Sequence, residues 1–134
     1  MTQREIKFRG KCIRGIFNEE WIHGSYVLSD EDDRGDGHRI VSYTGASFEI
    51  DPSTIGQYTG LKDKSGMLIY EGDIVKDDKG LALIHFMAPQ FVCVDENGKS
   101  WNLGGGTVYR DEHQLEVTEV IGNIYEHPHL LSHD

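Results

Sequence analysis

Residues 54–75 read TIGQYTGLKDKSGMLIYEGDIV, and this stretch decides the fold. Its first residues alternate in side-chain character with the period of two that a β-strand requires. Residues 62–66 form a polar turn ending at Gly66, where a hairpin accepts positive φ, and residues 67–70 are a short apolar run. Glu71-Gly72-Asp73 then predicts a tight turn with Gly72 in a conformation that other residues resist. A turn of this kind before an apolar strand is common at the start of small SH3-like barrels.

The rest of the chain repeats this rhythm of short apolar or alternating runs between turn signals, without a helical period. We expect strands near residues 6–9, 20–28, 38–43, 47–50, 81–86, 91–94 and 115–125. Asn97-Gly98 is a strong hairpin dipeptide, and a short helical turn is expected near residues 128–132. The pattern predicts a mainly β protein of small antiparallel β units, with less than about a fifth of the residues in helices.

Composition indicates a folded chain of one domain or two small units. The 134 residues are 37% hydrophobic and include two cysteines, Cys12 and Cys93, far apart in the sequence. Because no apolar run is long enough to span a membrane and the first residues lack an apolar secretion signal, we expect a cytoplasmic protein with free thiols. We expect an N-terminal β unit over residues 1–53 and a barrel region with a C-terminal tail over residues 54–134, which together can pack as one domain.

The net charge of −10 is unevenly distributed. Residues 61–134 carry thirteen acidic and six basic side chains, whereas residues 1–14 carry five basic side chains and one acidic. An acidic surface repels phosphates, so binding to duplex DNA is disfavoured. We expect the acidic turns to bind a basic protein partner, with solubility alone as the alternative. The candidate partner-binding residues are Asp77, Asp78, Asp95, Glu96, Asp111 and Glu112.

Three blocks of this sequence resemble the YopX family of phage and prophage proteins. They are residues 6–11 (IKFRGK) followed by Trp21 and Gly24, residues 54–75, and residues 120–126 (VIGNIYE). The resemblance implies a mostly β protein with an SH3-like barrel in its C-terminal half, encoded by a phage or prophage in a bacterial host. It implies no known reaction. Residues 127–131, HPHLL, depart from the family pattern Asn-Pro-Glu-Leu-Leu.

Two groups of side chains invite a metal-binding interpretation, and the sequence argues against both. A calcium loop starting at Asp30 would need ligands where Arg34 and Val41 stand, so the acidic loop is better explained by solvation. The terminal histidines lack the packed surroundings of a zinc site. The residues concerned are Asp30, Asp32, Asp33 and Asp36, and His127, His129 and His133. We expect no metal and no cofactor.

Three further patterns have an ordinary structural explanation. Cys93 and His85 lie on neighbouring expected strands, but their apolar neighbours favour a buried thiol over a catalytic dyad. The glycines of residues 104–106 lack the helix start and the Lys-Ser/Thr of a phosphate loop. Large aromatic residues are more often core residues than a binding patch. The aromatic residues considered are Trp21, Tyr58 and Tyr70.

The sequence therefore predicts a non-enzymatic phage or prophage accessory protein that acts by binding a macromolecular partner, with no membrane contact. Self-association stays open. One alternative is an enzyme with a shallow site, which clustered carboxylates of raised pKa would reveal. Another is a nucleic-acid-binding module using Lys7, Arg9 and Lys11. The simpler expectation is that these three side chains alternate into solvent.

Overall fold

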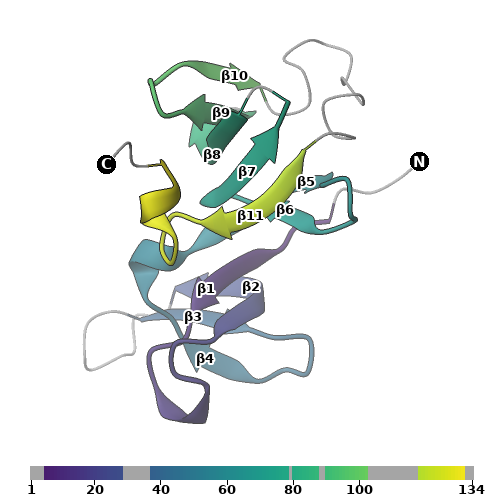
Figure 1. Ribbon diagram of the computed structural model, residues 1–134. Coiled ribbons are helices and arrows are strands. Elements are labelled where there is room, and N and C mark those ends of the chain that lie inside the picture. The colour runs from purple at the N-terminus through teal and green to yellow at the C-terminus, as the bar shows by residue number, and fades with distance from the viewer. Residues whose placement is uncertain (1–4, 29–36, 79, 88–89, 103–117, 132–134) are drawn as a thin grey trace. The chain divides into compact units, whose positions relative to one another are not determined.

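The structure is a computed structural model that describes residues 5–28, 37–78, 80–87, 90–102 and 118–131. The chain forms two compact units, Met1–Tyr58 and Thr59–Asp134, and passes from one to the other within strand β5 (Gly56–Lys62). The prediction of a mainly β protein is confirmed (Figure 1). In the described ranges the helical elements are three short 3-10 turns, η1 (Gly15–Phe17), η2 (Pro52–Thr54) and η3 (Pro128–Leu131), and no helix is long and apolar enough to cross a membrane.

The first unit is an antiparallel sheet in the order β4-β3-β2-β1-β5. Its other strands are β1 (Phe8–Lys11), β2 (Trp21–Leu28), β3 (His38–Val41) and β4 (Ser47–Glu49). A bridge between Cys12 and Ile50 joins the ends of β1 and β4, and the Asp51 N–H donates to the Lys11 carbonyl at 2.9 Å. The sheet therefore curls so that its edge strand returns to β1.

Alternation along the strands of the first unit separates an apolar face from a polar one, as a half-buried sheet requires. The apolar face encloses a core of Cys12, Ile22, Ile40 and Ile50, with Phe8, Phe48 and Ile55 packed against it. The other face of β1 carries Arg9 and Lys11, and Lys7 immediately precedes the strand.

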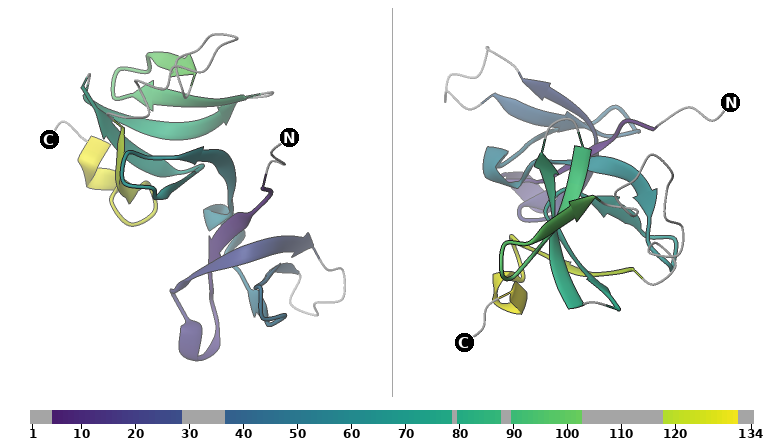
Figure 2. Two further views of the ribbon diagram at one scale, coloured as in Figure 1. Left: turned by 90° about the vertical axis from the view of Figure 1, so that its right-hand side faces the viewer. Right: turned by 90° about the horizontal axis from the view of Figure 1, so that it is seen from above.

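The second unit contains a five-stranded antiparallel sheet in the order β10-β9-β8-β7-β11. Its strands, twisted and curved in Figure 2, are β7 (Asp73–Asp77), β8 (Gly80–Met87), β9 (Gln90–Asp95), β10 (Ser100–Asn102) and β11 (Glu119–Asn123). The remainder of β5 lies beside β6 (Leu68–Tyr70). The five-stranded sheet is open between its described edges, β10 and β11, so a closed SH3-like barrel remains a prediction.

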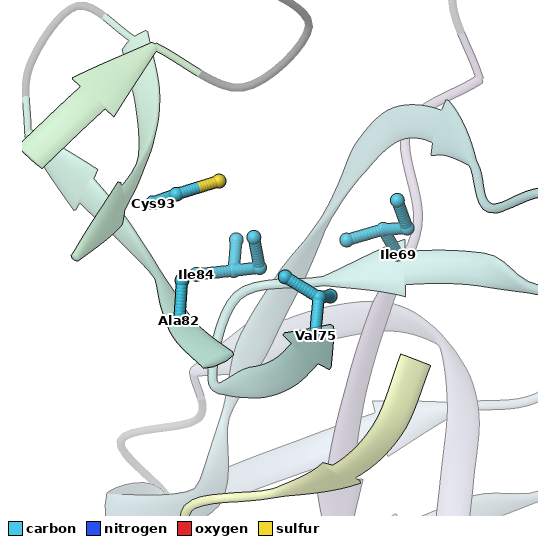
Figure 3. Close-up of a cluster of buried hydrophobic side chains, with 5 residues drawn as sticks. All are labelled: Ile69, Val75, Ala82, Ile84 and Cys93. Carbon is cyan, nitrogen blue, oxygen red and sulfur yellow. The ribbon is translucent and has the colours of Figure 1, made fainter. Parts of the chain in front are cut away.

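The core of the second unit joins β6 to the five-stranded sheet (Figure 3). Ile69, Val75, Ala82, Ile84 and Cys93 are each at most 1% exposed. Leu61 and Val120 pack against this cluster. Burial of these apolar side chains is the main stabilising contribution that the sheet receives.

Two hairpin turns of the second unit have the same construction. Asp63 and Asp95 each accept, through Oδ1, the backbone N–H groups two and four residues later at 2.8–2.9 Å. Each also accepts, through its carbonyl, the N–H of the glycine three residues later at 3.0 Å. Those glycines, Gly66 and Gly98, have φ of 86° and 83°. Both segments read Asp-x-Ser/Asn-Gly, so this pattern specifies the turn.

Asp63 makes one bond that Asp95 does not. Its Oδ2 accepts the Val120 N–H of β11 at 2.9 Å, and the neighbouring Lys64 N–H donates to the Thr118 carbonyl at 2.9 Å. Asp63 itself is only 7% exposed. Asp63 thus links the β5–β6 turn to β11 through a hydrogen bond.

The turn at Glu71-Gly72-Asp73 is confirmed. Gly72 has φ of 93°, and a Cβ there would lie 2.8 Å from Tyr125 Cε2. The backbone of Gly72 donates to the Ile84 carbonyl at 2.9 Å and accepts the Ile124 N–H at 2.8 Å. The buried carboxylate of Asp73 accepts the Tyr70 N–H at 2.8 Å. Both the backbone conformation and the ring of Tyr125 therefore require glycine at this position.

Gly72→Ala should lower the free energy of unfolding by about 2–3 kcal/mol, because it adds a clash with Tyr125 to the strain of positive φ. Gly66→Ala is the matched control, since its φ is 86° and a Cβ would meet nothing within 4 Å. Its cost should be about 1 kcal/mol. Denaturant unfolding measures both, and equal costs would show that the Tyr125 contact is unimportant.

Asp63→Asn should destabilise the protein by about 2–3 kcal/mol, because an amide NH₂ would face one of the three backbone N–H groups that the carboxylate accepts. Asp95→Asn should cost less than about 0.5 kcal/mol, since its two side-chain bonds both go to Oδ1, which asparagine retains. Both variants remove one negative charge, so charge alone predicts equal effects. Comparable unfolding free energies for the two variants would refute the distinct role of Asp63 Oδ2.

Candidate functional site

Two hairpin turns of the five-stranded sheet carry the described members of the predicted partner-binding set. Asp77 is the last residue of β7 and lies opposite Gly80, the first residue of β8. Asp95 is the last residue of β9 and lies opposite the third residue of β8. Both turns therefore lie at the same end of the sheet. We call this surface the acidic end, and it comprises Asp77, Asp78, Asp95 and Glu96.

The four acidic side chains differ in what they present to solvent. Asp78 and Glu96 are exposed, whereas Asp77 and Asp95 are partly buried. Asp95 also holds its own turn through Oδ1, a role that the sequence analysis missed. The repeated Asp-x-Ser/Asn-Gly pattern could have revealed it, because an aspartate that opens such a turn accepts its backbone N–H groups.

Lysines share this end of the sheet with the acids. Lys76 precedes Asp77 and lies opposite Glu119 across the β7–β11 ladder, and Lys64 Nζ lies 3.3 Å from Glu119 Oε2. Lys99 closes the β9–β10 turn and is exposed. The surface is thus acidic at its two turns and mixed in charge at its flank. The remaining predicted members, Asp111 and Glu112, lie outside the described residues, and the binding role of the set remains a prediction.

The register separates Cys93 from His85. Cys93 lies opposite Ile84, and His85 lies opposite Val92, so the two side chains point to opposite faces of the sheet. The Cys93 thiol is 1% exposed. Burial, with a smaller contribution from the Asp77 charge, raises its pKa to about 12. A nucleophilic thiol requires the reverse shift, so these residues do not form a catalytic dyad.

The basic strand β1 differs from the expectation that its side chains extend into solvent. The Arg9 guanidinium lies 4.7 Å from the centre of the Trp21 ring and Arg9 is only 9% exposed. Lys7 lies over the Tyr43 ring at 5.0 Å, and its side chain is 14% exposed. Aromatic rings and the methylene stems of the cations cover one another, which explains the burial.

The remaining basic side chain of the strand also stacks on Trp21, with Lys11 Nζ 5.7 Å from the ring centre. Partial burial, and then the charges of Arg9 and Lys7, lower the pKa of His23 on the neighbouring strand. The basic strand is therefore a packed polar layer of the first unit rather than a row of extended cations.

The remaining candidate residues form neither an aromatic surface patch nor a metal site in the described part of the chain. Tyr58 and Tyr70 are 4% and 3% exposed, so they belong to the interior and not to a surface patch. His127 Nδ1 accepts the Asn123 N–H at 3.2 Å, and the ring centres of His127 and His129 are 6.3 Å apart. Within the described ranges no three His, Cys, Asp or Glu side chains are grouped to hold a metal. The candidates outside those ranges are Asp30, Asp32, Asp33, Asp36, residues 104–106 and His133.

Comparison with known proteins identifies the family of this chain. It is similar in fold to protein EF1440 from Enterococcus faecalis, whose crystal structure gives a TM-score of 0.60 at 23% sequence identity, over 97% of this chain and 100% of that chain. No curated protein matches the sequence. The family model described as YopX protein matches residues 7–132. The resemblance seen in the sequence is therefore confirmed, and the chain belongs to the YopX protein family.

Proposed function

We propose that this chain is a non-enzymatic accessory protein of a phage or prophage, acting in the cytoplasm of the bacterial host by binding a protein partner through its acidic end. The observation that carries the proposal is the register of β7, β8 and β9, which brings two acidic turns to one end of one sheet. Their exposed members, Asp78 and Glu96, suit a basic partner.

The buried ionisable groups of the second unit support a binding role over catalysis. The carboxylates of Asp63 and Asp73 are 7% and 1% exposed and accept backbone N–H groups. The buried thiol of Cys93 has a raised pKa. Catalytic groups are usually reachable by substrate and have a pKa matched to their task. These three groups instead stabilise turns or pack in the core.

We also propose that the second unit is an open relative of an SH3-like barrel. Four consecutive strands, β7 to β10, each pair with the next, and the last strand, β11, returns beside β7. Return of the last strand to the first is the arrangement from which a small barrel closes. In such a unit the hairpin turns extend from a rigid sheet, which is how many folds present binding residues.

The partner can be sought by affinity capture from host lysate and its association rate then measured at low and high salt. The double variant Asp78→Asn/Glu96→Gln should slow association several-fold, toward the roughly 10⁵–10⁶ M⁻¹s⁻¹ of unsteered pairs, and flatten its salt dependence. Glu5→Gln/Glu126→Gln, which removes two exposed charges outside the acidic end, is the matched control and should leave the rate unchanged. Equal rates for both variants, or capture of no partner at all, would count against the acidic end.

Duplex DNA of random sequence should not be retarded by the protein at about 150 mM salt, because counterion release requires exposed cations. The net charge is −10, and Lys7 and Arg9 are largely buried. A gel-shift titration checks this. Micromolar binding that weakens as salt rises would show that the basic strand is accessible after all.

A further inference from the structure

The β1–β2 connection of the first unit exposes three large apolar side chains. Ile16 is 90% exposed, Phe17 41% and Ile13 36%. The connection extends beyond the ends of its strands as a long loop in Figures 1 and 2. We call these three residues the apolar knuckle. Single exposed apolar residues are ordinary, whereas several exposed on one loop mark a candidate contact surface.

Hydrogen bonds hold this loop in one shape. The Cys12 N–H donates to the Glu20 carbonyl at 2.9 Å, and the Glu19 N–H donates to the Cys12 carbonyl at 2.6 Å. Inside the loop, the Asn18 N–H donates to the Gly15 carbonyl at 3.2 Å. Glu19 has φ of 70°, a conformation that residues other than glycine, asparagine and aspartate rarely adopt. Such strain persists only where the surroundings enforce it.

The knuckle is also anchored to strand β4. The Ile13 N–H donates to the Glu49 carbonyl at 3.1 Å, and the Phe17 ring meets the Phe48 ring edge-on, with centres 5.4 Å apart. Ile16 is therefore held in water by a rigid support rather than on a loose loop. A rigid apolar surface loses little conformational entropy on binding, which favours association.

Charges of both signs flank the knuckle. Arg14 lies on the outgoing arm, half-exposed, with Nε on the Glu49 carboxylate. Glu19 and Glu20 lie on the returning arm, and both are exposed. A partner surface of a single sign would meet a like charge on one flank. A second copy related by a two-fold axis would instead place Arg14 opposite Glu19 and Glu20, with apolar side chains in the centre.

We propose that the apolar knuckle is the contact surface for a second copy of this chain. Net charge supports this surface over others, because residues 61–134 carry −7 of the total −10, which leaves −3 for the rest of the chain. An interface formed by the first unit therefore joins surfaces of the less acidic unit. The inference is independent of the acidic end and its partner.

The association should be weak. Stable interfaces bury roughly 1,200 Å² or more, and three exposed side chains with their flanking charges cannot supply that area. Dimers should therefore form only at high protein concentration and exchange rapidly with monomers. Backbone amide resonances of residues 13–20 should then shift progressively as concentration rises.

Sedimentation equilibrium of the full chain over a concentration series tests the proposal. Ile16→Ser should weaken self-association about tenfold or more. Ile6→Ser is the matched control, since it removes an isoleucine that is 70% exposed outside the knuckle, and should leave association unchanged. Glu19→Lys/Glu20→Lys should also weaken self-association, because the new lysines would face Arg14 of the second copy.

Three results would overturn the proposal. A chain that stays monomeric at every concentration would show that the knuckle does not contact a second copy and faces solvent or a different protein. Dimers that persist in Ile16→Ser lie on another surface, and an equal effect of Ile6→Ser indicates non-specific apolar association. Because Ile6 and Ile16 are both exposed, neither substitution should prevent folding, and circular dichroism confirms this for each variant.

Discussion

The carboxylate of Asp63 accepts three backbone N–H groups from two segments that are far apart in the sequence. Two come from its own turn, and the third comes from Val120, 57 residues away. Within the sheet, the only described strand that pairs with β11 is β7. A register shift between Val120 and Gly122 interrupts the β7–β11 ladder. A buried charge-assisted hydrogen bond is stronger than a neutral one, so this carboxylate compensates for the interrupted ladder. The placement of the last strand, and with it the return of the sheet toward its first strand, depends on Asp63.

Local patterns in the sequence predicted most of the strands and turns, because a hairpin turn is specified by the few residues within it. The turn at Gly72, the hairpin at Asn97-Gly98 and the helical turn after Pro128 were all predicted. The placement of β11 was not, since a pairing across 57 residues leaves no local period to detect. The same limit of local patterns applies to Asp63. The neighbouring residues predict its role in the turn, but they do not predict its hydrogen bond to Val120.

For the candidate site, the sequence located acidic residues in turns but did not show what surrounds them. Position in a turn predicts exposure, and Asp78 and Glu96 are exposed. It does not predict that Asp95 holds its own turn or that Lys76 and Lys64 flank the surface. Alternation in β1 correctly divided the strand into two faces, yet Arg9 is buried because the Trp21 ring covers it. Periodicity reports which face a side chain is on, and only the three-dimensional packing determines whether that face meets water.

These contacts restrict which charges of the acidic end can change without changing the fold. Asp95, which opens a hairpin, accepts two backbone N–H groups with one oxygen, so its carboxylate contributes both to the turn and to the surface charge. The carboxylates of Asp78 and Glu96 are exposed, whereas the carboxylate of Asp95 accepts two N–H groups of its own turn. Replacement of Asp95 by alanine would therefore confound loss of the turn with loss of the charge, whereas asparagine separates the two. The same reasoning applies to any hairpin of the Asp-x-Ser/Asn-Gly type: charge can be tested there only with the isosteric amide, because the carboxylate is also part of the backbone hydrogen-bonding network.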